Sequence, residues 1–159
     1  MKLKTAAALS ALLTVAVAAP AFASPDVYVV NFRNAQDVKS QQLDSQLPVA
    51  ISMAGVQAEE VVIDTSTAAK WEKGAHEAFD RDIVPVFNQW VGLPGFAAVV
   101  DADTKRVIGC VNATFSANEM ARELQKMASI AKGQAFTSRA SVSAKTTRCP
   151  APHNVDLGN

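Results

Sequence analysis

The chain lacks a closely spaced pair of cysteines. Among its 159 residues only Cys110 and Cys149 carry thiols, and they stand far apart in the sequence. Rapid disulfide exchange needs an activated thiolate with a second thiol beside it. The sequence therefore excludes a compact Cys-x-x-Cys redox centre, unless the fold brings these two cysteines together at an exposed, positively charged position.

A surplus of charge and recognisable catalytic motifs are also absent. With 15 basic and 15 acidic residues, the chain shows no footprint for nucleic acid or for an anionic membrane surface. The two histidines, His76 and His153, have no ligand at zinc spacing on one element. Glu72, His76 and Asp80 share one face of an expected helix, for which a solvated face is the favoured interpretation. Without a phosphate loop, nucleophile elbow or carboxylate pair, we expect no catalytic residue, no metal and no cofactor.

Long apolar runs are missing except near the first residue. Lys2 and Lys4 precede the apolar stretch Ala6–Ala19, and the small-x-small triplet Ala21–Ala23 follows. This pattern predicts a signal peptide over residues 1–23, and the alternative of a membrane anchor requires a longer apolar stretch. We expect an exported protein without stable membrane insertion after cleavage, in the periplasm or secreted.

An exported protein with two cysteines usually contains a disulfide bond, because it meets an oxidising compartment. We therefore predict a structural bond between Cys110 and Cys149. Cys110 lies within an expected strand, where a buried sulfur or a bridge is favoured over a reactive thiol. The alternative of a redox-active pair stays open at this stage.

The pattern of apolar residues predicts alternating strands and helices. The first helix contains Pro48, which is unfavourable within a helix. The segment between the last two strands, "DADTK", is short enough for an antiparallel hairpin. The expected strands cover 27–32, 61–63, 96–100 and 106–111, and the expected helices cover 35–53, 68–90 and a segment that begins after Ser116.

Two local signals are informative. Pro85 should kink or divide the helix over 68–90. Ser116 and Glu119 have the spacing of a capping box, with Phe115 and Met120 placed for a hydrophobic staple. The last helix should therefore begin after Ser116 and continue to Gly133.

The sequence predicts one domain over residues 24–132 and an irregular tail over 133–159. The tail is rich in Ser, Thr, Ala and Pro and has few large apolar residues. Cys149 is its one clear means of attachment, so we expect the tail to be tied back by the disulfide.

This order of elements resembles the thioredoxin fold, through "VYVVNF" as first central strand and "VGLPGFAAVVDADTKRVIGCVNATFSANEMARELQKM" as second half. The resemblance implies an α/β fold, a three-layer α/β/α sandwich with a mixed sheet. In that family a Gly-hydrophobic-Pro step precedes the third central strand, and its proline is cis and faces the active site. Here "GLP" makes Pro94 the candidate cis-proline. Where thioredoxins place their reactive cysteines, this chain has Arg33, Asn34, Ala35 and Gln36.

The chain is also similar to exported thioredoxin-like proteins of conjugative-transfer and integrative-element secretion systems, which lack the cysteine pair. The residues concerned are "VYVV", "VFNQWVGLPGFAAVVD" and "RVIG". This resemblance implies a non-catalytic scaffold or accessory protein of an envelope assembly, such as a conjugative-transfer or type IV secretion apparatus, with other envelope proteins as partners. The alternatives are a periplasmic thiol-disulfide oxidoreductase or isomerase-like protein that uses Cys110 and Cys149, and a small-ligand binding module.

Overall fold

The computed structural model describes residues 24–134 and 148–153. The expected signal peptide over 1–23 lies outside the described residues, as do 135–147 and 154–159. The elements follow one another as β1 (Val27–Arg33), α1 (Val38–Ala54), β2 (Ala58–Asp64), α2 (Ala68–Asp80), α3 (Val84–Trp90), β3 (Phe96–Asp101), β4 (Val107–Asn112) and α4 (Ala117–Ala131).

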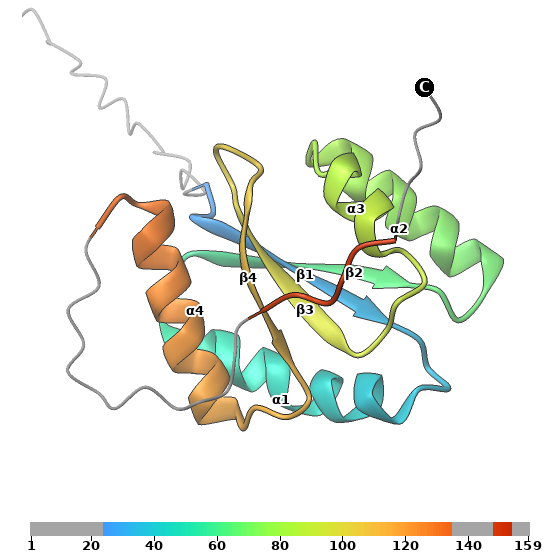
Figure 1. Cartoon of the computed structure of the whole chain (residues 1–159), viewed down its shortest axis with the longest axis horizontal. Coiled ribbons are helices and arrows are strands. Elements are labelled where there is room, and N and C mark those ends of the chain that lie inside the picture. Colours follow the sequence, from blue (N-terminus) through green and yellow to red (C-terminus); the bar gives the residue numbers. More distant parts are fainter. Residues whose placement is uncertain (1–23, 135–147, 154–159) are drawn as a thin grey trace, which may run out of the picture.

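The four strands form one mixed sheet in the order β2-β1-β3-β4 (Figure 1). Strand β1 is parallel to β2 and antiparallel to β3, and β3 is antiparallel to β4. The predicted alternation of strands and helices and the predicted β3–β4 hairpin are confirmed. The fold is therefore α/β with a mixed sheet, as the sequence indicates.

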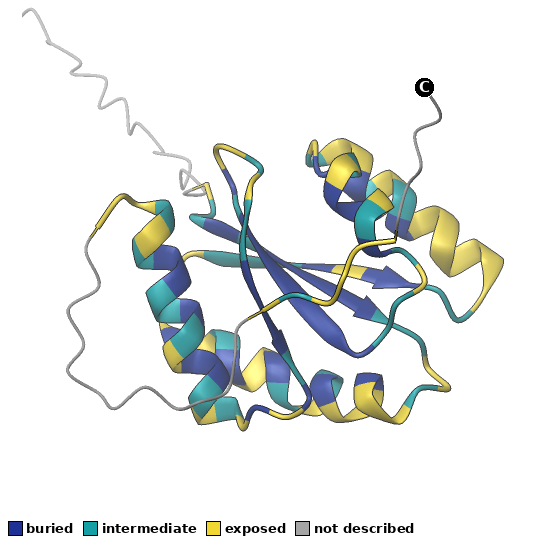
Figure 2. Ribbon diagram, in the orientation of Figure 1, coloured by how far each residue is buried: buried dark blue, intermediate teal, exposed yellow. Residues whose placement is uncertain are grey.

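Helices cover both faces of the sheet, so that the protein has two cores. Val27 and Val29 of β1 face the core made with α1 and α4. Val30 and Phe32 of the same strand face the core made with α2 and α3. This alternation is the period of two that a strand imposes on its side chains. Figure 2 shows the central strands β1 and β3 buried along most of their length, the edge strands β2 and β4 only partly buried, and the helices exposed on their outer sides.

Helix α1 continues through Pro48 to Ala54. A proline inside a helix removes one backbone hydrogen bond and is unfavourable there. Leu43 and Leu47 before it and Ala50 after it are all buried in the α1–α4 core. The burial of this helix face outweighs the unfavourable effect of Pro48 on the helix. The strength of that burial depends on the tertiary packing and is not visible in the local sequence.

The expected helix over 68–90 is divided, as Pro85 predicts. Helix α2 ends at Asp80, and Asp82 adopts a positive φ of 56° in the connection. Pro85 lies in the first turn of α3. At that place a helix needs no N–H donor, so proline is accommodated.

The capping box at the start of α4 is confirmed. The hydroxyl oxygen of Ser116 accepts the amide N–H of Glu119, and a carboxylate oxygen of Glu119 accepts the amide N–H of Ser116 at 2.8 Å. Phe115 and Met120, at the positions of the expected staple, are both buried in the α1–α4 core.

The expectation that Pro94 is a cis-proline is wrong. No peptide bond among the described residues is cis, so the bond before Pro94 is trans. The loop that leads into β3 instead takes its sharp course from Gly92 and Gly95, whose φ values are 89° and 91°. Glycine adopts these angles without steric cost, which gives the loop a route into β3 that needs no cis bond.

Candidate functional site

A groove of about 450 Å³ lies where α1 begins, beside the loop before β3 and the end of β4. Its volume falls within the range that is usual for small-molecule sites. Both cysteines contribute to its wall. The groove is lined by Lys39, Gln42, Pro94, Gly95, Phe96, Cys110, Asn112, Ala113, Thr114, Arg148, Cys149 and Pro150.

The loop before β3 packs tightly against the start of α1. A Cβ atom built on Gly95 would lie 2.8 Å from Cβ of Lys39 and 3.1 Å from Oδ2 of Asp37. The amide of Gly95 also donates to the carbonyl of Phe32 at 2.9 Å, which ties the loop to the end of β1. The Gly-Leu-Pro loop therefore lies directly beside the start of the first helix, and Pro94 in it is trans.

Several backbone amides just before α1 and in its first turn are bonded to the chain's own side chains. The amide of Ala35 donates to Oγ of Ser66 at 2.7 Å, and the amide of Gln36 donates to Oδ1 of Asn34 at 3.0 Å. Asp37 caps the helix, with Oδ2 accepting the amide of Ser40 at 2.7 Å. A helix start stabilises a bound anion or a thiolate through free amides and a positive dipole end. Here a carboxylate of the protein occupies that position.

The predicted disulfide between Cys110 and Cys149 is confirmed. The two sulfur atoms are 2.05 Å apart, and the Cα atoms are separated by 4.9 Å. Cys110 is only 2% exposed and belongs to the core on the side of α2 and α3, whereas Cys149 is half-buried against that core. The bond therefore fastens the tail to the sheet face that also carries these two helices.

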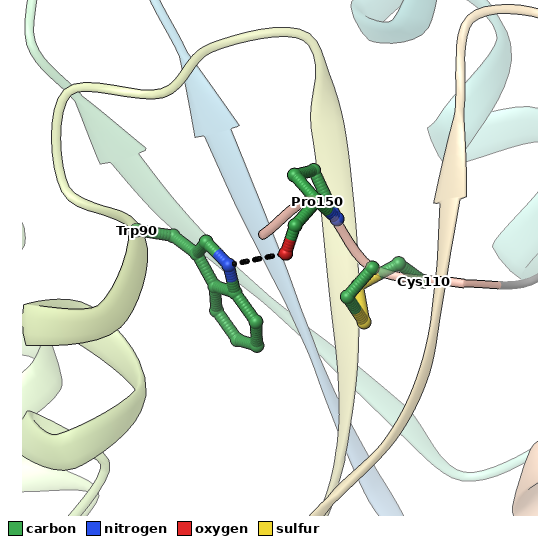
Figure 3. Close-up of a disulfide and its surroundings, with 4 residues drawn as sticks. Trp90, Cys110 and Pro150 are labelled. Carbon is green, nitrogen blue, oxygen red and sulfur yellow. Dashed lines mark hydrogen bonds between the residues drawn. A yellow bond between two sulfur atoms is a disulfide. The ribbon is translucent and has the colours of Figure 1, made fainter. Parts of the chain in front are cut away.

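Residues 148–153, which we call the strap, run from the disulfide to the end of α3 (Figure 1). Nε1 of Trp90 donates to the carbonyl of Pro150 at 3.0 Å, as Figure 3 shows beside the disulfide. The amide of His153 donates to the carbonyl of Gln89 at 2.9 Å, and Nε2 of His153 lies 3.0 Å from the carbonyl oxygen of Val91.

The non-covalent attachment of the strap is weak. A hydrogen bond contributes about 0.5–1.5 kcal/mol net, whereas ordering the backbone costs about 1–2 kcal/mol for each residue. Every strap residue except Cys149 is itself exposed, so apart from what it covers on the aromatic core the strap buries little apolar surface of its own. The three hydrogen bonds therefore do not offset the ordering of the strap, and the covalent bond holds it in place.

The charge of the groove is one-sided. Lys39 and Arg148 are exposed lining residues, and among the residues that the structure describes no carboxylate belongs to the lining. A thiolate or another anion that approaches the disulfide from this side would meet two positive charges. The sequence alone does not single out either cation as a groove residue. Lys39 lies in the first turn of α1, and Arg148 is far away in the sequence and is brought to the groove by the disulfide at Cys149.

A second hollow, of about 420 Å³, lies along the edge strand β2 and is strongly charged. Asp64 lies there 3.3 Å from Nη1 of Arg33 and 3.1 Å from Nζ of Lys70. Burial opposes ionisation of Asp64, but the hydrogen bonds from the hydroxyl and amide of Ser66, with Lys70 and Arg33, lower its pKa below the ordinary value. Asp64 is thus held as a carboxylate by its neighbours.

Arg81 forms the other end of this hollow. Burial opposes its charge, yet Glu59 and Glu77 raise the pKa of Arg81 above the ordinary value. Nη2 of Arg81 lies 2.6 Å from a carboxylate oxygen of Glu59. The main charges of this hollow are therefore paired with one another, so the groove beside the disulfide is the better candidate site.

The histidines do not converge on either hollow. His76 is exposed on α2, and His153 is in the strap. Within residues 24–134 and 148–153, no group of three or more His, Cys, Asp or Glu side chains is arranged to hold a metal ion.

In the same described part of the chain, no helix has the length and apolar character needed to cross a bilayer.

Comparison of the whole chain with protein-family models, with curated proteins and with solved structures found no match in any of the three.

Proposed function

We propose that this chain is an exported, non-enzymatic thioredoxin-like protein that binds partners in an envelope assembly. Support for the fold assignment comes from the order of the elements and from a mixed sheet with helices on both faces. A thioredoxin-like fold without its catalytic pair is most simply a binding scaffold.

The observation that carries this proposal is that the start of α1 is capped by the chain's own Asp37 and has no thiol. The segment from Asn34 to Asp37 has no thiol, and Asp37 accepts the amide that could otherwise stabilise a thiolate. A reactive cysteine pair at this place would need different residues. Binding through the neighbouring groove has no such requirement.

The assignment to a conjugative-transfer or type IV secretion assembly rests on the resemblance of "VYVV", "VFNQWVGLPGFAAVVD" and "RVIG". Export, to the periplasm or as a secreted protein, is proposed on the expected signal peptide over residues 1–23. The disulfide is compatible with export because such bonds persist in oxidising compartments.

The test is a complementation experiment in a deletion strain. The tagged protein should fractionate with the periplasm, copurify with defined components of the secretion apparatus and restore DNA transfer. The variant Lys39→Glu reverses a groove charge and should weaken copurification. The variant Arg122→Glu, on an exposed position of α4 outside the groove, is the matched control. The assembly role would be rejected if the deletion strain transferred DNA as well as the wild type and the tagged protein purified as a monomer without any component of the apparatus.

The rival function is a thiol-disulfide oxidoreductase that uses Cys110 and Cys149. The specific observation in its favour is that both cysteines line an open groove together with Lys39 and Arg148. A cationic neighbourhood lowers the pKa of a thiol and favours its thiolate. Insulin reduction well above that of a Cys110→Ala variant would establish this function in place of the scaffold, and equal rates would exclude it.

A further inference from the structure

The strap covers an aromatic cluster between α3 and β3. The ring of Trp90 contacts Phe32 and Phe96 edge-on, with centroids 6.1 and 5.9 Å apart, and the rings of Phe32 and Phe96 are stacked. Trp90 is only 4% exposed and Phe96 only 3%. Cys110 belongs to the same core, and Cys149 of the strap packs against it.

The indole of Trp90 connects this cluster to the strap directly. Its N–H donates to the carbonyl of Pro150, the residue that follows Cys149 (Figure 3). If the strap leaves, this buried donor loses its partner and becomes accessible to water. The environment of Trp90 therefore depends on whether the strap is in place.

The disulfide controls that outcome, because the hydrogen bonds of the strap do not hold it by themselves. The bond is also open to attack, since both cysteines line the groove and Cys149 is the more exposed of the two. Lys39 and Arg148, which line the same groove, attract an incoming thiolate.

We propose that the Cys110–Cys149 bond is a redox-operated latch. Its reduction releases the strap and uncovers the surface of Trp90 and Phe96, while the α/β domain stays folded. The inference concerns the isolated protein and does not depend on the proposed envelope partner.

The chemistry is a two-step exchange with a dithiol as reductant. One thiolate of the dithiol attacks the sulfur of Cys149, the disulfide breaks, and the sulfur of Cys110 leaves as a thiolate that takes up a proton from water. The second thiol of the reductant then attacks the mixed disulfide and releases Cys149. Two electrons pass to the protein, which ends with two thiols, and the reductant ends as a disulfide.

The test uses tryptophan fluorescence of the full processed chain in the variant Trp71→Phe, where Trp90 is the sole reporter. Dithiothreitol should shift the emission to longer wavelength and increase quenching by acrylamide several-fold, with both thiols then open to alkylation. The matched control Trp90→Phe, which reports Trp71 on α2, should respond little.

Two further measurements keep the test decisive. The double variant Cys110→Ser/Cys149→Ser should show the red-shifted emission without reductant and should not respond to it. Hydrogen exchange at the amide of His153, which donates to Gln89 in the latched state, should accelerate about ten-fold or more on reduction, while amides of β1 stay protected. Unchanged Trp90 emission and His153 exchange after complete alkylation would overturn the latch. Loss of protection throughout the sheet would equally overturn it, since the bond would then hold the whole fold.

Discussion

Gly95 lies so close to the first turn of α1 that a Cβ atom on it would come within 2.8 Å of Cβ of Lys39. This contact sets the spacing between the loop before β3 and the helix start, and it therefore shapes one side of the groove. Because Gly95 also has a φ of 91°, two separate constraints demand glycine at this position.

Substitution Gly95→Ala should lower the free energy of unfolding more than Gly92→Ala. Both positions have a positive φ, which costs about 1–2 kcal/mol for a residue with a Cβ atom. Gly92 has no atom within 4 Å of a built Cβ, so it measures the cost of the φ angle alone. At Gly95 we expect a further loss of about 1–3 kcal/mol from overpacking. Urea unfolding of the two variants tests this, and equal losses would mean that the contact with Lys39 relaxes freely.

Reduction of the disulfide should lower the free energy of unfolding by less than the full loop-closure value. For a bond that joins residues 39 positions apart, the chain-entropy model gives about 4 kcal/mol. Release of the strap returns part of this to the reduced native state, so a smaller loss is expected. Unfolding curves with and without dithiothreitol measure it, and the double variant Cys110→Ser/Cys149→Ser should be indifferent to the reductant. A loss above the model value would contradict this account.

Substitution Asp64→Asn should destabilise the protein near pH 7 by about 2 kcal/mol, since hydrogen bonds to charged groups are strong. The folded protein lowers the pKa of Asp64, so its contribution is complete above the unfolded pKa of about 3.9 and disappears as the pH falls through the folded value. The gap in stability between wild type and Asp64→Asn should therefore narrow below about pH 4. Denaturation at a series of pH values tests the sign.

In the same series Asp103→Asn, at an exposed turn position, should leave the stability at pH 7 unchanged. A constant gap between wild type and Asp64→Asn from pH 7 down to about pH 2 would show that the ionised form of Asp64 is not what stabilises the fold.

Substitution Ser116→Ala should cost about 1 kcal/mol, because the amide of Glu119 loses its acceptor at the start of α4. Ser116→Thr keeps an oxygen at the same place and should recover most of the loss. Thermal unfolding of the two variants compares them directly. An alanine variant as stable as wild type would show that the packing of Phe115 and Met120 suffices to start the helix.

Local patterns in the sequence were enough for the elements and for much of the topology. The capping box at Ser116 and the division of a long helix near Pro85 depend on residues a few positions apart. Short-range hydrogen bonds and steric effects of this kind can be predicted from the sequence. The pairing of Cys110 with Cys149 was predictable for another reason, since only two cysteines are present.

The tertiary structure decided what lies around those elements. Gly95 meets Lys39, and Trp90 donates to Pro150, across separations in the chain that no periodicity records. The bond before Pro94 is trans, which a Gly-Leu-Pro pattern does not specify. Such contacts depend on the simultaneous packing of several elements, so the groove and the strap emerge only when the chain is folded.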